Sequence, residues 1–206
     1  MPLDDPDMPM AGLTPPPDEL ADMMTITYRH DRPEFEYSFL LPDGWYQQPT
    51  PEKKPDLKDS EYDFLSLGVY SVARDFVPPV LFSVGVRPAP KKGYVAEWLE
   101  RQCIMQGLAL ERMTVHKFLV GWGADAIALQ ASDIGPLKMR IVMFEDSQRL
   151  WVLTGMAPLS LWEGSVIPLS RAICSFELLA PGKQNVPILP KPEGLDMTSE
   201  PTRSSA

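Results

Sequence analysis

Four strand-like segments precede each of the only two helical stretches in this 206-residue chain. The strand-like segments are runs rich in β-branched and aromatic residues, with alternating or continuous apolar character. Successive strands without a helix between them pair largely antiparallel, because parallel neighbours need a long crossover connection. Several of these strands are apolar on both faces, which indicates that both faces of the sheet are covered. The order therefore predicts an α+β fold, with a largely antiparallel sheet of six or more strands flanked by helices.

The predicted strands form two groups, one on either side of the first helix. A polar loop with three prolines, 47–61, divides the first group. In the second group, 145–148 is predicted as a four-residue hairpin loop. In chain order, the strands are expected at 24–30, 35–41, 64–73, 79–86, 110–120, 124–132, 137–144 and 149–155.

The two predicted helices carry distinct end signals. Gly107 is a stop signal for the first helix, 92–105, whose apolar face is formed by Val95, Leu99 and Cys103. The second helix is predicted over 161–174 with Ser160 as its N-cap. Pro168 lies inside it and cannot donate the helical hydrogen bond, so we expect a late start or a kink there.

The acidity of the chain is concentrated at one end. Of a net charge of −9, residues 1–22 contribute six acids and no Lys or Arg, whereas 23–179 carries a net charge of only −3. We therefore predict an acidic, proline-rich disordered leader (1–22), one domain (23–179) and a proline-rich flexible tail (180–206). Three apolar residues in the tail can dock on the domain or on a partner as an extended strip, namely Val186, Ile188 and Leu189.

Composition also bears on location and on partner class. The leader has neither the positive nor the apolar region of a secretory signal, and no run of about 18 apolar residues occurs. Two cysteines cannot form a disulfide framework and fit a reducing compartment. These features predict a cytoplasmic protein without a membrane span. A nearly neutral domain with no basic run argues against nucleic acid as a partner.

No residue pattern in the chain is typical of a catalytic, metal or cofactor site. His30 and His116 are the only histidines, and neither is accompanied by a nucleophile motif. Cys103 and Cys174 are expected to be buried, inert thiols, and two Cys with two scattered His do not give zinc-ligand spacing. The stretch 121–123 lacks the Gly, Lys and helix of a phosphate loop. We therefore expect no enzyme, no metal and no cofactor.

Small side chains on three predicted strands are the one pattern that indicates a binding surface. Small residues on a sheet allow another backbone to approach closely. One interpretation is that the chain's own helix packs there. The other is a shallow apolar groove that receives a helix of a partner. The residues predicted to line this groove are Ser66, Gly68, Tyr70, Leu81, Ser83, Gly85, Ala126 and Ala128.

Three landmarks occur in an order that resembles a known superfamily. They are the strand and turn FLLPDGW at 39–45, one central helix between two strand groups, and a terminal helix that leads into SFEL at 175–178. Over about 24–179 the chain resembles the superfamily of PsbP, the DcrB-like proteins and a Ran-binding nuclear import factor. The resemblance implies an antiparallel sheet sandwiched by helices, and a binding, assembly or chaperone role without catalytic residues.

Within that superfamily, the Eag-type chaperones of type VI secretion are similar in lacking an export signal. They form dimers and shelter apolar helices of secreted effectors. The acidic leader, the 47–61 loop and the long tail depart from them. The resemblance implies a protein partner with an apolar or helical segment, bound by a homodimer or within a larger complex.

Three functions follow from these observations. The first is a cytoplasmic adaptor or chaperone that binds a protein partner, such as a secretion substrate, through an apolar sheet face. The second is a structural subunit of a larger assembly of the secretion type, threaded through its neighbours by its tails. The third is a hydrolase that depends on His30 or His116, or a binder of small ligands.

Overall fold

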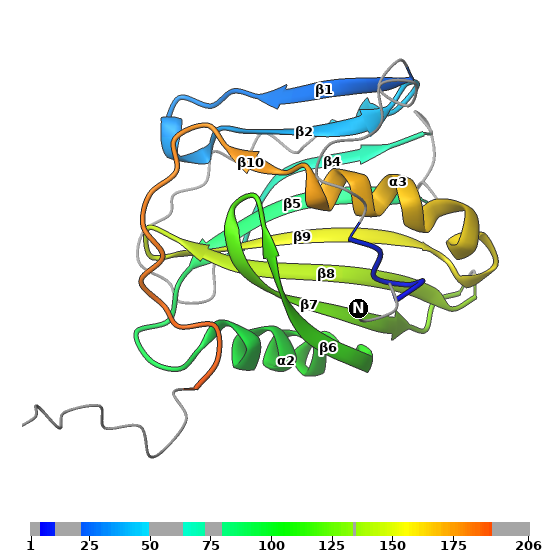
Figure 1. Ribbon diagram of the computed structural model, residues 1–206. Helices are drawn as coiled ribbons and strands as arrows, with labels where there is room; N and C mark the ends of the chain where they lie inside the picture. Colours follow the sequence, from blue (N-terminus) through cyan, green and yellow to red (C-terminus); the bar gives the residue numbers. More distant parts are fainter. Residues whose placement is uncertain (1–4, 11–21, 50–63, 73–79, 134, 191–206) are drawn as a thin grey trace, which may run out of the picture.

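The fold is that of a computed structural model, which describes residues 5–10, 22–49, 64–72, 80–133 and 135–190. Its centre is a seven-stranded sheet in the order β3-β4-β5-β9-β8-β7-β6 (Figure 1). Every neighbouring pair in this sheet is antiparallel. The strands are β3 (Tyr46–Gln47), β4 (Leu65–Ser71), β5 (Leu81–Pro88), β6 (Ala109–Phe118), β7 (Gly121–Gln130), β8 (Leu137–Asp146) and β9 (Arg149–Pro158).

Both faces of this sheet are covered. Helix α3 (Trp162–Cys174) and a second sheet of three strands pack on one face (Figure 1). Helix α2 (Val95–Met105) packs on the other face. The three-stranded sheet has the order β1-β2-β10 and consists of β1 (Met23–Tyr28), β2 (Tyr37–Pro42) and β10 (Glu177–Leu178). The predicted α+β class and the largely antiparallel sheet flanked by helices are confirmed.

Each face has its own hydrophobic core. The core beneath α3 and β2 is rich in aromatic side chains, including Tyr37, Phe39, Tyr70, Phe82, Trp151 and Phe176. The core beneath α2 is built of aliphatic and small side chains, including Leu99, Ala124, Ala126, Met143 and Val152. The three-stranded sheet therefore packs on the large sheet through aromatic rings, whereas α2 packs on it through aliphatic and small side chains.

The helix ends differ in part from their predicted positions. Gly107 follows Gln106, the C-cap of α2, and has a φ of +67°, which agrees with its predicted role as a stop signal. Ser160 is not the N-cap of α3, because it lies in the short 3-10 helix Leu159–Leu161 and the cap position is Leu161. Helix α3 starts at Trp162 and continues through Pro168. Residue Gly164, whose carbonyl loses its helical donor at Pro168, is exposed and open to water.

The hairpin between β8 and β9 is tighter than predicted. The strands extend to Asp146 and start again at Arg149, so the turn has two residues instead of four. Ser147 and Gln148 both have positive φ angles, 51° and 64°. This is the backbone of a type I′ turn, whose twist matches that of the flanking strands. The predicted four-residue loop is wrong because the ladder continues for two more residues.

Parts of both predicted tails pack on the domain. Residues 5–10 lie on the face of α3, and Met8 is buried in the aromatic core. At the other end, Val186 and Ile188 pack against the core beneath α2, which is the docking on the domain that the sequence left open. Glu145 fixes this strip by accepting hydrogen bonds from the backbone N–H groups of Asn185 and Val186. The rest of both tails, and most of the loop 47–61, lies outside the described residues.

Candidate functional site

The registers of the strands align side chains in rows on the face that α2 covers. Each row contains one residue from β5, β9, β8 and β7, in that order, because pairing partners point to the same face of a sheet. The three rows are Leu81-Met156-Met139-Ala128, Ser83-Thr154-Ile141-Ala126 and Gly85-Val152-Met143-Ala124.

Helix α2 covers only one end of these rows. Ala126 and Ala128 are fully buried in the core that Val95, Leu99 and Cys103 of α2 complete. Alanine on β7 lets the helix approach the sheet closely, which explains the row of small residues there. For Ala126 and Ala128, the interpretation that the chain's own helix packs on the small side chains therefore holds.

The other end of the rows is only partly covered. Five side chains of β4, β5 and β9 on this face are half-buried and contiguous in the ladder, and we call them the open sheet face: Val69, Leu81, Ser83, Thr154 and Met156. Leu81 and Ser83 were among the predicted groove residues, and the structure brings them together here. Ser66, also predicted, is exposed and pairs with Gly85 at the border of this face.

Phe64 closes the open sheet face at the row of Gly85. A Cβ atom added to Gly85 would lie 1.9 Å from Cζ of Phe64, so the ring occupies the space that a side chain would fill. The ring itself is 53% exposed. At Gly85, predicted to line the partner groove, an aromatic side chain of the same protein therefore takes the place that a partner would occupy.

Gly68 and Tyr70 do not line this face. A bulge between Ser66 and Gly68 shifts the register, so Ser66 pairs with Gly85 while Gly68 pairs with Val84. Gly68 and Tyr70 thus point into the aromatic core, where the space at Gly68 is bounded by the Tyr37 hydroxyl. Their assignment to the groove is wrong because strict alternation along β4 is broken by the extra residue.

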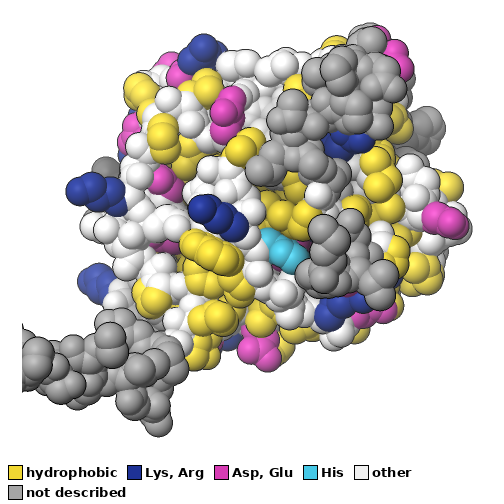
Figure 2. Space-filling model, viewed as in Figure 1, with side chains coloured by type: hydrophobic (Ala, Val, Ile, Leu, Met, Phe, Trp, Pro, Cys, Tyr) yellow, Lys and Arg dark blue, Asp and Glu magenta, His cyan; other side chains and the backbone are white. Residues whose placement is uncertain are grey.

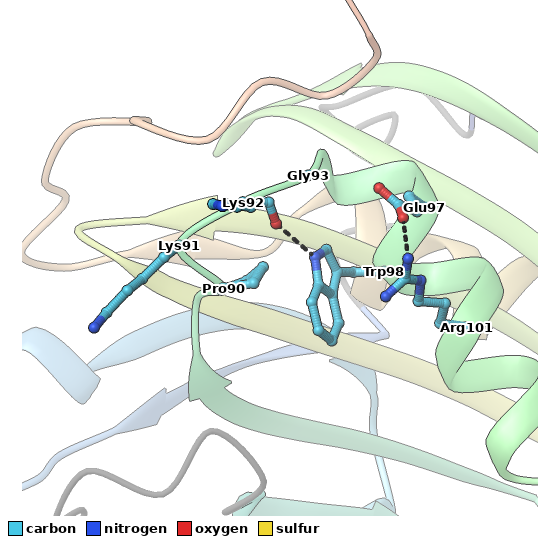
Figure 3. Close-up of a pocket in the computed structure, with 7 residues that line it drawn as sticks. All are labelled: Pro90, Lys91, Lys92, Gly93, Glu97, Trp98 and Arg101. Carbon is cyan, nitrogen blue, oxygen red and sulfur yellow. Dashed lines mark hydrogen bonds and ion pairs between the residues drawn. The ribbon is translucent and has the colours of Figure 1, made fainter.

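A shallow pocket lies at the start of α2 (Figure 3). It is lined by Pro90, Lys91, Lys92, Gly93, Glu97, Trp98 and Arg101 and has a volume of about 370 Å³. The Trp98 indole donates a hydrogen bond to the Lys92 carbonyl at 3.2 Å, and Glu97 is paired with Arg101. Lys91 points away from the indole in Figure 3. The first N–H groups of α2 donate to Pro187 and Ile188, so they are not available to an anion here.

The histidines form no catalytic arrangement in the described part of the chain. His30 is half-buried, and its Nδ1 accepts a hydrogen bond from the backbone N–H of Arg32 at 3.0 Å. His116 Nε2 lies 3.8 Å from Asp125 Oδ2 and has no hydrogen-bond partner. The Asp125 carboxylate is instead bound by Arg140, with Nη2 to Oδ2 at 2.6 Å, and both side chains are fully buried.

The cysteines fit the predicted buried thiols. Cys103 and Cys174 are both free and buried, and desolvation raises the pKa of each thiol. Within 5–10, 22–49, 64–72, 80–133 and 135–190, no cluster of three or more His, Cys, Asp or Glu is placed to hold a metal ion. Among the helices that the structure describes, none is long and apolar enough to cross a bilayer. The face in Figure 2 shows Lys and Arg scattered among other side chains, without a continuous basic patch among its described residues.

Two solved structures have the same arrangement of sheets and helices. The cyanobacterial PsbP protein CyanoP from Synechocystis sp. PCC 6803 superimposes with a TM-score of 0.54, at 13% identity, over 77% of this chain and 93% of that chain. LpqN from Mycobacterium tuberculosis, a protein involved in cell envelope biogenesis, gives a TM-score of 0.50 at 9% identity, over 75% and 90% of the two chains. The chain has the PsbP-like fold. No family model and no curated protein matches the sequence.

Within the PsbP-like fold, sequence reasoning found the open sheet face only in part. It missed Val69, Thr154 and Met156, because nothing in the sequence shows which strands are neighbours and β9 lies between β5 and β8. It also missed Phe64 as a cover for Gly85. An aromatic residue on one strand can cover a glycine on the neighbouring strand. The sequence indicates such packing only once the register of the two strands is known.

Proposed function

We propose that this protein is a non-catalytic binding domain, an adaptor or chaperone, which holds an apolar segment of a partner protein against the open sheet face. The observation that carries the proposal is that the rows of Leu81 and Ser83 begin beneath α2, at Ala128 and Ala126, and end in side chains that are only half-buried. Such a half-covered surface suits a partner's helix lying beside α2.

The composition of the open sheet face supports an apolar partner. Leu81, Met156 and Val69 are apolar, and Ser83 with Thr154 gives a shallow row between bulkier side chains. Burial of apolar surface contributes roughly 25 cal/mol per Å², so even a short helix on this face gains several kcal/mol before its ordering costs. Met156 is unbranched and adapts to different partner shapes.

The partner class that we place first is a secretion substrate with an apolar helix, which rests on the similarity to Eag-type chaperones. As part of the same proposal, the protein acts in the cytoplasm, where Cys103 and Cys174 stay reduced. A role as a threaded assembly subunit is less well supported, because residues 180–190 are bound along their own domain. His-dependent hydrolysis is also less well supported, because Asp125 is bound by Arg140 rather than by His116.

The test is a substitution that blocks the open sheet face without touching the cores. Ser83→Trp places an indole on that face, whereas Gly85 is unsuitable because Phe64 covers it. Ser160→Trp is the matched control, since Ser160 is exposed beside α3 on the opposite side of the sheet. Wild type and both variants are used to purify partners from the source cells, and the purified partner is then titrated calorimetrically.

We expect Ser83→Trp to weaken the affinity for the partner by about tenfold or more, and Ser160→Trp to leave that affinity unchanged. Circular dichroism and thermal melts establish that both variants are folded, since overpacking can itself cost about 1–3 kcal/mol. Equal affinity of all three proteins would refute a role for the open sheet face. Recovery of one fixed set of many components, lost only when the tails are deleted, would favour the assembly subunit.

A further inference from the structure

Residues 5–10 lie on the other side of the sheet from the open sheet face. The surface that they occupy, which we call the groove, is formed by β8, α3 and the edge strand β6, which carry their partners. Figure 1 shows the segment in dark blue, on the side of the sheet that carries α3. We call residues 5–10 the strap.

An acidic side chain of the strap lies in a socket of donors from three elements. Asp7 Oδ1 accepts a hydrogen bond from Trp162 Nε1 at 2.7 Å, and Oδ2 accepts one from Lys138 Nζ at 2.9 Å. Arg112 also pairs with Asp7, and with Asp5 at 3.0 Å. Charge-assisted bonds of this kind are roughly twice as strong as neutral ones, so the socket selects a carboxylate.

The next two residues of the strap, Met8 and Pro9, contact the aromatic core and a buried guanidinium. Met8 is only 3% exposed. Arg140 Nη1 donates to the Pro9 carbonyl at 2.9 Å and to Ser170 Oγ at 2.8 Å, and its side chain is fully buried. A buried charge aimed at a backbone carbonyl recognises an extended peptide whatever its side chain at that position.

The strap has few internal hydrogen bonds, too few to hold its conformation without the domain. The backbone N–H groups of Asp7 and Met8 bond back to Asp5, at 2.9 Å and 3.0 Å, and form one turn. Among the described residues, its other hydrogen bonds and ion pairs go to β6, β8 and α3. The strap is therefore held as a bound peptide is held, by a surface that the domain provides.

We propose that this groove is a peptide-binding site for an acidic residue followed by a large apolar residue and proline, and that the strap fills it in competition with a partner segment of the same pattern. The site differs in place and chemistry from the open sheet face, so each proposal can fail alone. Tethering gives the strap an effective concentration of the order of 1 mM, so a partner segment must be tighter or the strap must be displaced.

The experiment uses the full chain and a labelled, end-blocked peptide with the sequence of residues 5–10. Asp7→Lys puts a positive charge beside Lys138 and Arg112, and the repulsion should release the strap. Asp133→Lys makes the same charge change at an exposed turn and is the control. Fluorescence anisotropy follows the peptide, and the indole N–H resonance of Trp162 in ¹H–¹⁵N spectra reports whether a carboxylate is in the socket.

We expect Asp7→Lys to bind the peptide about tenfold or more tightly than wild type or Asp133→Lys, because the tethered competitor is gone. The Trp162 resonance should leave its wild-type position in Asp7→Lys and return on addition of the peptide. A peptide with Asn in place of its second Asp, and the double variant Asp7→Lys with Arg112→Glu, should both lose binding. If Asp7→Lys fails to fold, Asp7→Asn serves in its place.

The proposal is overturned if a folded, strap-released variant shows no saturable peptide binding up to about 1 mM, the concentration that the tether itself supplies. It is equally overturned if the Asn peptide binds as well as the Asp peptide, since the socket would then not select a carboxylate. Neither result bears on Ser83→Trp or on the open sheet face.

Discussion

The hydroxyl oxygens of Tyr37 and Tyr70 lie 3.0 Å apart inside the aromatic core, and together they join the three-stranded sheet to the seven-stranded sheet. Each phenol is fully buried, and within the described part of the chain each hydroxyl replaces water by bonding to the other. Tyr70→Phe is therefore expected to cost about 1–3 kcal/mol of unfolding free energy, because it leaves the Tyr37 hydroxyl without a partner. The double variant with Tyr37→Phe should recover part of this loss. Chemical denaturation of the two single variants and the double variant checks it, and strictly additive losses would contradict it.

The same pair makes the protein sensitive to alkali. Burial raises the pKa of Tyr70 to about 12, and it raises the pKa of Tyr37 above its ordinary value as well. The unfolded chain therefore loses these protons first, near pH 10, so stability is complete below that pH and falls as the pH rises toward 12. Denaturation midpoints measured between these limits should fall more steeply for wild type than for the double Phe variant. Parallel curves would show that other groups dominate.

The buried pair of Asp125 and Arg140 is expected to tolerate joint replacement better than removal of one partner. Arg140→Met leaves the Asp125 carboxylate without its guanidinium and should cost about 3–5 kcal/mol. Replacing both residues with apolar side chains should cost less, because no charge then stays buried. Thermal melts of the three variants measure this, and a double variant as unstable as Arg140→Met would count against it.

Acid should release the strap. Burial alone would raise the pKa of Asp7, but the hydrogen bonds from Lys138 and Trp162 and the charges of Lys138 and Arg112 outweigh it and hold the pKa below its ordinary value. Asp7 therefore adds stability above pH of about 4, and this stability is lost as the pH falls through its lower folded-state value. Wild type should lose more stability than Asp7→Asn on acidification below pH of about 4. Equal losses in urea titrations would contradict the assignment.

The two-residue turn offers a stabilising change. Gln148 is exposed and has a φ of 64°, a conformation that glycine adopts without strain. Gln148→Gly keeps both backbone bonds of this residue, its N–H to Glu145 and its carbonyl to Ala89. We expect a gain of up to about 1 kcal/mol, or about 2–4 °C in Tm for a domain of this size. Gln184→Gly, in the docked strip, is a control in which no gain is expected.

The succession of strands along the chain and the class of the fold could be predicted from this sequence, because periodicity is a local property. The runs of β-branched and aromatic residues give every strand of five residues or more, whereas β3 and β10 are two residues long and too short for any period. Pairing is not local. Nothing near β5 indicates that its neighbour is β9, and the rows of the open sheet face depend on that.

The candidate site could be predicted only in part for the same reason. Alternation along β4 places Ser66, Gly68 and Tyr70 on one face, and a single bulge separates the first from the other two. The row of alanines on β7 was visible in the sequence, but a row of small residues does not say what packs on it. The binding of the strap depends on Asp7 meeting residues more than a hundred positions away, such as Arg112 and Lys138, which no local pattern reveals.

The docking of the strip after β10 has a consequence for the order in which the protein can be completed. The first two N–H groups of α2, on Val95 and Ala96, donate to the carbonyls of Pro187 and Ile188 at 2.9 Å and 3.1 Å. A ribosome releases α2 long before it releases those carbonyls. The nascent domain must therefore wait, with the first turn of α2 lacking these two acceptors, until Ile188 has emerged.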